Sequence, residues 1–297
     1  MKAQPNRQPA GMDRPGPGRR EAVAADRRYL GRRWIYTQVS GRTGGLSVGV
    51  NLTPGHQCDY RCRYCDVPKA VSPQPDAVDG LALARELEET LESIRTGEIF
   101  SHPAYLRLPV ELRTLGQVML SGEGEPTLCP NFLEVVEALV HARARGRHPF
   151  FRFVLETNGS GLERPGVLEG LGHFTSKDEV WVKLDAGTAE RFRSINGVEL
   201  PFDQVLSRIR SFGRLRPVVI HSLFASLEGC PPTRSEIGAY LRCLNDLRSE
   251  GAGISRVQIY SVGDAPLDSG CSLLPLGSLS EIARQVRLEV GVEADVF

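Results

Sequence analysis

The chain has 297 residues, of which 41% are hydrophobic, and its acidic and basic residues balance to a formal net charge of zero. A chain of this length and composition can bury a large core, and no apolar run reaches the roughly eighteen residues that cross a bilayer. Seven cysteines without regular spacing do not form the pattern of a secreted, disulfide-rich protein. We therefore expect a cytoplasmic protein with no membrane partner.

The beginning of the chain differs from the rest. Residues 1–33 contain nine basic and three acidic residues, together with frequent Pro and Gly. Such low hydrophobicity disfavours folding, so we predict a flexible N-terminal segment over residues 1–40 and one folded domain over residues 41–297. The basic arm would suit RNA phosphates or an acidic partner, and an organellar targeting segment is a further alternative.

Short apolar runs alternate with helical patterns beyond residue 41. Six runs have the length and composition of buried parallel strands: 46–52, 118–120, 150–155, 180–184, 218–223 and 257–262. Apolar residues at helical spacing fill the gaps between them, as at Leu83, Leu87 and Leu91. A last helix is expected over residues 279–286, before a closing segment at 292–297.

This alternation predicts an α/β fold in which about six βα units form an open, partial parallel barrel. Active sites of such barrels lie at the carboxyl ends of the strands. Candidate residues can therefore be recognised by whether they follow a predicted strand.

Three cysteines follow the first predicted strand within QCDYRCRYC, at Cys58, Cys62 and Cys65. A four-iron cluster normally takes four cysteine ligands, so three would leave one iron open for chemistry. Tyr64 adds an aromatic ring beside such a cluster. The alternative is a zinc site completed by His56, although structural zinc sites usually take ligands from two separated knuckles.

The second predicted strand is followed by SGEGEPTL at residues 121–128. Gly122 and Gly124 would let the backbone approach a ligand closely, and Glu125 would offer a carboxylate to a cationic group. The alternative is a glycine-rich turn with a solvated glutamate.

The next two strands also end in polar residues. Glu156, Thr157 and Asn158 end the third strand, and Lys183 and Asp185 lie on one side of the fourth because they are two residues apart. Buried charges need partners, so these residues either form a structural ion pair or bind a ligand.

Three motifs together resemble the radical S-adenosylmethionine (SAM) enzymes: GLSVGVNLTPGHQCDYRCRYC, SGEGEPTL and VWVKLDAGT. The resemblance covers about residues 40–297 and is nearest to the Fe–S oxidoreductase branch that includes wybutosine synthases. Those synthases hold a second cluster through cysteines ahead of this motif, whereas residues 1–57 contain none. The resemblance therefore implies the radical chemistry but not the tRNA reaction.

For the cofactors, the resemblance implies that Cys58, Cys62 and Cys65 are the catalytic cysteines and ligate a [4Fe–4S] cluster. SAM binds the open iron and is cleaved reductively to a 5′-deoxyadenosyl radical that abstracts a substrate hydrogen. In the implied SAM site, Tyr64 lies against the adenine. The two glycines and the glutamate after the second strand orient the methionine ammonium. Asp185, with Lys183 or Asn158, fixes the ribose or the carboxylate. These cofactor-binding residues are Tyr64, Gly122, Gly124, Glu125, Asn158, Lys183 and Asp185.

The substrate is left open by these motifs. We favour a small molecule or natural-product intermediate, with an external electron donor such as a flavodoxin or ferredoxin. The alternatives are an RNA- or protein-modifying radical SAM enzyme and, from another class, a non-catalytic metal-binding protein with a structural cysteine cluster.

The remaining candidates are less specific. We interpret His221 as a hydrogen-bonded core residue, Asn196-Gly197 as a turn, and Tyr260 as either an adenine contact or a barrel filler. Cys243 fits the apolar face of a helix. Three other cysteines fall in predicted strand-to-helix loops, where one could act as a thiol hydrogen donor or second-cluster ligand: Cys129, Cys230 and Cys271.

Overall fold

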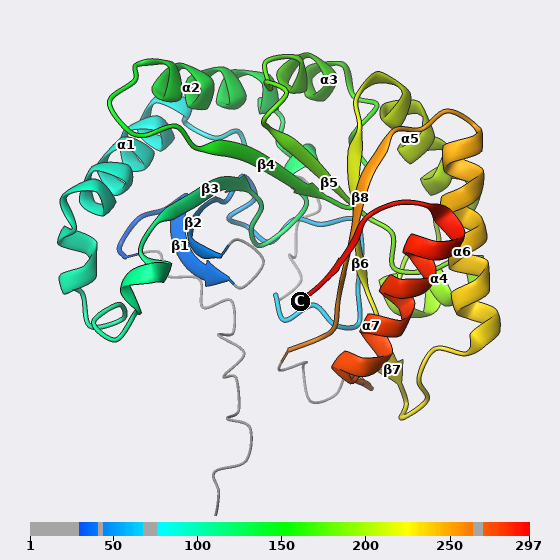
Figure 1. The fold of residues 1–297 in the computed structure, drawn as a ribbon. Coiled ribbons are helices and arrows are strands. Elements are labelled where there is room, and N and C mark those ends of the chain that lie inside the picture. Colours follow the sequence, from blue (N-terminus) through cyan, green and yellow to red (C-terminus); the bar gives the residue numbers. More distant parts are fainter. Residues whose placement is uncertain (1–29, 41–43, 68–75, 264–269) are drawn as a thin grey trace, which may run out of the picture.

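An eight-stranded sheet forms the centre of the computed structural model, which describes residues 30–40, 44–67, 76–263 and 270–297. The sheet curls into an open half-barrel with helices along its convex side (Figure 1). Its strands, in spatial order, are β1 (Ile35–Ser40), β2 (Gly45–Val50), β3 (Leu115–Leu120), β4 (Arg152–Thr157), β5 (Glu179–Lys183), β6 (Val218–Leu223), β8 (Ile254–Tyr260) and β10 (Ala294–Val296).

Only the β1–β2 pair is antiparallel in this sheet; the other neighbouring strands are parallel. The six predicted strands correspond to β2, β3, β4, β5, β6 and β8, and the predicted closing segment contains β10. The prediction of an open parallel barrel is therefore confirmed.

Helices connect successive strands and bury the predicted apolar stripes against the sheet. On α1, for example, Leu83, Leu87 and Leu91 are at most 2% exposed. The helices are α1 (Gly80–Thr96), α2 (Phe132–Ala144), α3 (Pro165–Gly172), α4 (Ala189–Asn196), α5 (Phe202–Leu215), α6 (Arg234–Ser249) and α7 (Leu276–Gln285), the last continuing into a π-helical turn at Val286–Val290. Among the described residues, no helix is both long and apolar enough to cross a membrane.

Strand β1 corrects the predicted boundary at residue 40. Ile35 and Tyr36 are buried, and Trp34 donates its backbone N–H to Glu86 of α1 (3.0 Å). The Tyr36 ring covers Gly49 of β2, where an added Cβ would lie 2.0 Å from it. The folded part thus begins before residue 41, because six residues that alternate poorly in hydrophobicity are stabilised by pairing with β2. The prediction for the first 29 residues lies outside the described ranges.

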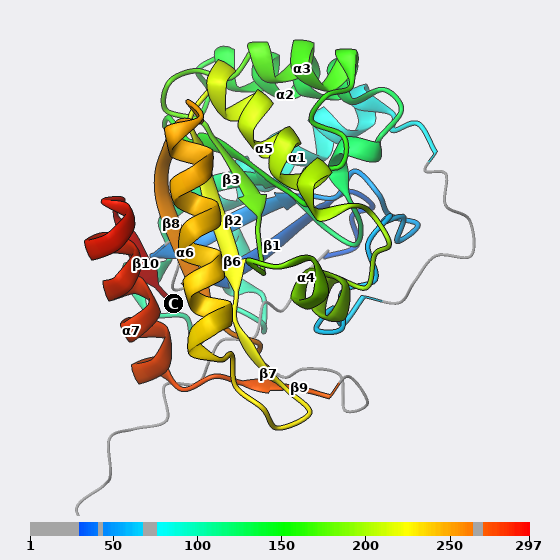
Figure 2. The same ribbon diagram turned by 90° about the vertical axis from the view of Figure 1, so that its right-hand side faces the viewer.

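A second, smaller sheet lies beside the barrel. Strands β7 (Ala225–Leu227) and β9 (Cys271–Leu273) pair antiparallel and project past the lower end of α6 (Figure 2). Strand β7 follows β6, and β9 follows β8, so this two-stranded unit stands at the carboxyl-terminal end of the barrel strands.

The concave face of the half-barrel is layered, because alternate residues of each strand point to it. An apolar belt crosses its middle and consists of Met119, Val154, Trp181 and Val219, each at most 3% exposed. Polar side chains lie on both sides of this belt. We call those toward the carboxyl ends of the strands the upper layer, and those toward the amino ends the floor row.

Candidate functional site

The cysteine loop, residues 51–67, leaves the carboxyl end of β2 and carries three partly buried thiols, of Cys58, Cys62 and Cys65. Two neighbouring segments hold its backbone in place. The N–H groups of Arg61 and Arg63 donate to the last carbonyls of α4 (3.0 and 2.9 Å), and the carbonyl of Gln57 accepts from Glu125 N–H (2.8 Å). The loop is therefore clamped between α4 and the glycine-rich segment that follows β3.

The end of α4 makes this clamp possible. Asn196 and Gly197, predicted as a turn, are the last residue and the C-cap of α4, and Gly197 adopts a left-handed φ of 59°. A Cβ at Gly197 would lie 2.3 Å from the carbonyl oxygen of Arg61. Only glycine combines this backbone conformation with so close an approach.

Asn196 is a site residue that the sequence did not reveal. Its buried side-chain amide donates to Asp185 Oδ2 (2.8 Å) and to Cys62 Sγ (3.4 Å). The residue thus bridges the cysteine loop and the end of β5. An Asn-Gly pair at a helix end signals a cap, and nothing in that pattern indicates this second role.

The two glycines after β3 seat the cysteine loop. A Cβ at Gly122 would lie 2.3 Å from Asn51 Oδ1, and one at Gly124 would lie 2.0 Å from the carbonyl oxygen of Gln57. These glycines thus allow a close approach to another segment of the protein. The predicted approach to a ligand stays a prediction. Asn51, directly after β2, could have been found by the same rule that singled out the other strand ends.

Glu125 is a buried carboxylate that is 2% exposed. Thr127 donates to it through its N–H and hydroxyl (3.0 and 2.6 Å), Thr157 through its hydroxyl (2.5 Å), and Asn158 through its N–H (2.7 Å). Burial raises the pKa of Glu125 to about 7, against the opposing effect of these donors. Because protein donors occupy both carboxylate oxygens, this side chain joins the ends of β3 and β4.

The thiols lie in surroundings that disfavour a free thiolate. Burial, followed by the nearby Glu125 charge, raises the pKa of Cys58 to about 12, and burial also raises the pKa of Cys62. Side-chain amides lie near both sulfurs: Asn196 near Cys62, and Asn158 at 3.9 Å from Cys58 Sγ. A bound metal cation would supply the charge that ionises such thiols, and the amides would then stabilise the thiolates.

Lys183 and Asp185 form the charged part of the upper layer. Lys183 Nζ lies 3.5 Å from Asp185 Oδ1, donates to Tyr260 Oη, and lies 5.0 Å from the ring centroids of both Tyr64 and Tyr260. Burial alone would lower the pKa of Lys183, but Asp185 and its other neighbours raise it, so the ammonium stays charged. Asp185 also accepts from Tyr64 Oη (2.6 Å) and from Leu223 N–H (2.8 Å).

His221 is a buried, hydrogen-bonded residue of the upper layer, as predicted. Its ring stacks between Trp181 and Tyr260, with centroids 5.4 and 4.3 Å away. Nδ1 faces Gln258 Oε1 at 3.0 Å, and Nε2 lies 3.4 Å from Glu156 Oε1. The stack fixes Tyr260 and therefore the position of the Lys183 ammonium.

The other cysteines separate into two groups. Cys129 packs in the core between sheet and helices, so its predicted place near a substrate is wrong. Cys243 is buried on α6, as predicted, and its thiol faces the carbonyl of Gly187 (3.3 Å). Cys230 is exposed after β7, whereas Cys271 packs in an apolar cluster that includes Tyr64 and Tyr260.

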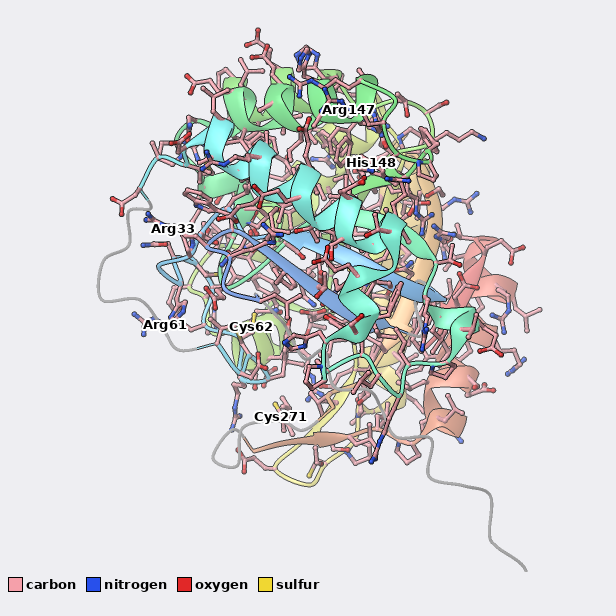
Figure 3. The ribbon with its side chains drawn as sticks, turned by 90° about the vertical axis from the view of Figure 1, so that its left-hand side faces the viewer. Arg33, Arg61, Cys62, Arg147, His148 and Cys271 are labelled. Atoms are coloured by element: carbon pink, nitrogen blue, oxygen red, sulfur yellow. The ribbon has the colours of Figure 1, made fainter. Side chains whose placement is uncertain are left out.

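Figure 3 shows Cys62 and Cys271 toward one end of the molecule and the labelled Arg147 and His148 toward the other. The latter two follow α2 and precede β4, so they mark the amino end of the barrel strands. The cysteine loop and the β7–β9 unit thus both lie at the carboxyl end.

The donor set fits a multi-iron cluster better than a single zinc ion. Among the described residues, no three His, Cys, Asp or Glu side chains are placed to share one metal ion. His56, the fourth ligand of the zinc alternative, has Nε2 at 3.5 Å from Glu123 Oε2. In a four-iron cluster each thiolate binds a different iron, so the three sulfurs need not converge on one point.

Comparison with known proteins agrees with this geometry. The family model described as the Radical SAM superfamily matches residues 52–226, a range that begins in the cysteine loop and ends in β7. A protein of Helicobacter pylori (strain ATCC 700392 / 26695), called UPF0026 protein, is 26% identical over 181 residues, which cover 59% of this chain and 49% of its own. The chain thus spans about half the length of the curated relatives it matches.

Two solved structures share the fold. A radical SAM methyltransferase from Sphaerobacter thermophilus superposes with a TM-score of 0.59 at 13% identity, over 89% of this chain and 68% of its own. An archaeal TYW1, a wybutosine synthase, superposes with a TM-score of 0.52 at 11% identity, over 86% of this chain and 83% of its own. At these identities the likeness concerns the fold alone, and it confirms the predicted architecture.

Proposed function

Because the chain belongs to the radical SAM superfamily, whose enzymes use a [4Fe–4S] cluster and SAM, we propose that Cys58, Cys62 and Cys65 hold such a cluster and that the chain cleaves SAM reductively. One observation carries this proposal: the Asn196 amide contacts both the Cys62 sulfur and the Asp185 carboxylate. A single side chain thereby couples the proposed cluster ligand to the residues proposed to bind SAM.

When bound, the cluster and SAM supply a 5′-deoxyadenosyl radical. The protein binds and orients these groups and excludes water from them. Asn158 and Asn196 hold the sulfurs of Cys58 and Cys62 by amide contacts, which tune a thiolate site. The clamp on both sides of the cysteine loop keeps the three thiols in a fixed arrangement before metal binds.

The SAM-binding residues follow from their positions around this loop. We expect Tyr64, Lys183 and Asp185 to bind the ribose or the methionine carboxylate, because they form one connected group at the end of β5. Gly122, Gly124 and Glu125 would meet the ammonium through main-chain atoms, since the Glu125 carboxylate already accepts from protein donors.

For the substrate, we favour a small polar molecule. The upper layer presents charges of both signs, from Glu156 and Lys183, in the same part of the concave face. A substrate with matching polar groups would be oriented there beside the proposed cluster. An external one-electron donor of the flavodoxin or ferredoxin type would complete the reaction.

The test is anaerobic reconstitution of the full chain with iron and sulfide. Wild-type protein should bind about four irons, absorb visible light, and form 5′-deoxyadenosine from SAM in the presence of a strong reductant. Cys62→Ala should lose both the absorbance and the product. Cys230→Ala, which removes an exposed thiol outside the cysteine loop, should keep both. Fully reconstituted wild-type protein that forms no more product than Cys62→Ala would refute the proposal.

The bridging amide has its own test. Asn196→Ala should retain iron less well and bind SAM more weakly, each by roughly tenfold, as for other residues that support metal ligands. Asn245→Ala, an exposed asparagine on α6, is the matched control and should leave both quantities unchanged. If Asn196→Ala matches its control, the coupling is absent.

A further inference from the structure

The floor row is a set of five polar side chains at the amino ends of the strands, on the concave face and opposite the cysteine loop. Register places Ser47 beside Gln117 and Gln117 beside Arg152 on adjacent strands. Hydrogen bonds and ion pairs continue the row to β5 and β8. Its members are Ser47, Gln117, Arg152, Glu179 and Arg256.

The row carries a net positive charge, since two guanidiniums share one carboxylate. Arg152 Nη1 and Arg256 Nη2 both donate to Glu179 Oε1 (3.1 and 2.5 Å), and Trp181 Nε1 donates to Glu179 Oε2 (2.8 Å). The Arg152 and Arg256 side chains are 30% and 29% exposed. An ion approaching from the amino end of the barrel can therefore reach this charge.

Three buried atoms of the row have no hydrogen-bond partner in the described part of the chain: Ser47 Oγ, Gln117 Nε2 and Arg256 Nε. Ser47 and Gln117 are themselves 0% exposed. Folded proteins rarely leave such atoms unpaired without a bound water or ion. Gln117 Nε2 and Arg256 Nε can only donate a hydrogen bond, and Ser47 Oγ can donate or accept one, so an acceptor would satisfy all three.

The orientation of the Gln117 amide supports this view. Its Oε1 accepts from Arg152 Nε and Nη2 (3.2 and 2.9 Å). Exchanging the amide oxygen and nitrogen would place an NH₂ group against a guanidinium, which is itself only a donor. Arg152 therefore fixes the Gln117 oxygen and leaves the NH₂ group available to a ligand.

The apolar belt separates the floor row from the upper layer. Met119, Val154, Trp181 and Val219 are at most 3% exposed and pack together between the two sets of polar side chains. A ligand at the floor row would thus enter from the amino end. It would not be the substrate of the proposed reaction, and its binding does not depend on that reaction.

We propose that the floor row binds a small oxyanion, of the phosphate or carboxylate type. Arg152 and Arg256 would supply the charge, and Gln117 Nε2, Ser47 Oγ and Arg256 Nε would supply the missing donors. Charge-assisted hydrogen bonds from guanidinium to oxyanions are among the strongest in proteins, which favours an anion over a water molecule here.

The test compares salts at equal ionic strength. Thermal unfolding of the reconstituted full chain should shift upward with inorganic phosphate relative to chloride, and the shift should saturate, because a ligand that binds only the folded state stabilises it. A parallel titration with malonate distinguishes a carboxylate from a phosphate preference. Arg256→Gln should weaken the phosphate affinity about tenfold or more, whereas Arg242→Gln, on the exposed face of α6, should not change it.

Ser47→Ala is the sharper variant. Since the Ser47 hydroxyl has no partner among the described residues, its removal should leave the unfolding temperature in chloride unchanged while weakening anion affinity several-fold. If neither phosphate nor malonate shifts unfolding beyond chloride, the proposal is overturned. A shift that is identical in wild type, Arg256→Gln and Ser47→Ala would also overturn it.

Discussion

The upper layer and the floor row are built on the same strands of one concave face, yet their polar atoms are paired to different degrees. In the upper layer, Asp185 alone accepts from Tyr64, Asn196 and Leu223, which come from three separate segments of the chain. In the floor row, Glu179 serves two arginines and a tryptophan from the sheet itself. The sheet places charged side chains at both ends of its strands. Among the described residues, donors from outside the sheet, on the cysteine loop and α4, pair with the carboxylate of the upper layer but not with that of the floor row.

This difference predicts unequal sensitivity to substitution. Buried charges that depend on several distant segments should be expensive to disturb, because each lost contact leaves another polar group unpaired. Partly exposed charges at the floor can be rehydrated. The predictions that follow test this contrast, beginning with the largest expected effect.

Asp185→Ala should have the largest effect. It leaves the Lys183 charge and three donors without their shared acceptor in a buried site, and breaking such a pair typically costs about 3–5 kcal/mol of unfolding free energy. Urea denaturation at pH 7 would measure the loss. Glu179→Ala is the matched control at the other end of β5, where water can reach both arginines, and it should lose less than half as much. Equal losses would remove the distinction between the two layers.

The next prediction concerns pH and Glu125. Its pKa is raised from 4.5 to about 7 in the folded chain, so between these values the folded state binds the proton more tightly than the unfolded state. The resulting stability is fully present below pH 4.5 and is lost as the pH rises through about 7. The shift corresponds to at most about 3.5 kcal/mol, at roughly 1.4 kcal/mol per pKa unit.

Unfolding free energies measured from pH 5 to pH 8 would reveal this loss. Glu125→Gln cannot titrate, so its stability should fall less steeply than that of the wild type over the same range. Glu111→Gln, an exposed acid ahead of β3, should keep the wild-type slope. Parallel curves for wild type and Glu125→Gln would show that Glu125 does not titrate in this window.

Gly124→Ala should cost about 2 kcal/mol, in the range of other overpacking substitutions. The added Cβ would meet the Gln57 carbonyl at 2.0 Å and push the cysteine loop from its seat, so iron retention should fall together with unfolding free energy. Gly166→Ala on α3 is the control, since no atom in the described part of the chain lies within 4 Å of its added Cβ. It should be neutral or slightly stabilising. Normal iron content in Gly124→Ala would show that the loop can shift without losing its ligand geometry.

The parts of the molecule that could be predicted from sequence share one property: they depend on local pattern. Buried parallel strands, the stripe at Leu83, Leu87 and Leu91, and the placement of Lys183 with Asp185 on one side of a strand all follow from periodicity. The cysteine triplet is equally local. The periodic features therefore agree with the structure, although β1 was not predicted because it lies beside a charged segment. The role of the cysteine triplet stays a prediction.

What could not be predicted depends on contacts between distant segments. The bridge from Asn196 to Cys62 joins residues 134 positions apart, and the Asn158 contact with Asp59 joins residues 99 apart. In the floor row, Gln117 and Arg152 come from different strands, and the sequence gives no indication that both sit on one register line. Such pairings exist only once the strands have assembled into the curled sheet.

The smallest expected effect concerns an exposed contact at the site end. Arg63 of the cysteine loop forms an ion pair with Glu228 after β7, and their side chains are 34% and 69% exposed. Solvent screening limits such pairs to less than about 1 kcal/mol, so Glu228→Gln should barely change urea unfolding. Glutamine keeps the Cβ and hence any strain from the φ of 48° at this position. Glu199→Gln, which breaks the exposed pair with Arg193 on α4, gives the baseline. A cost for Glu228→Gln well above that baseline would mean that the β7–β9 unit and the cysteine loop unfold together, which would extend the tightly paired upper layer out to the surface of the molecule.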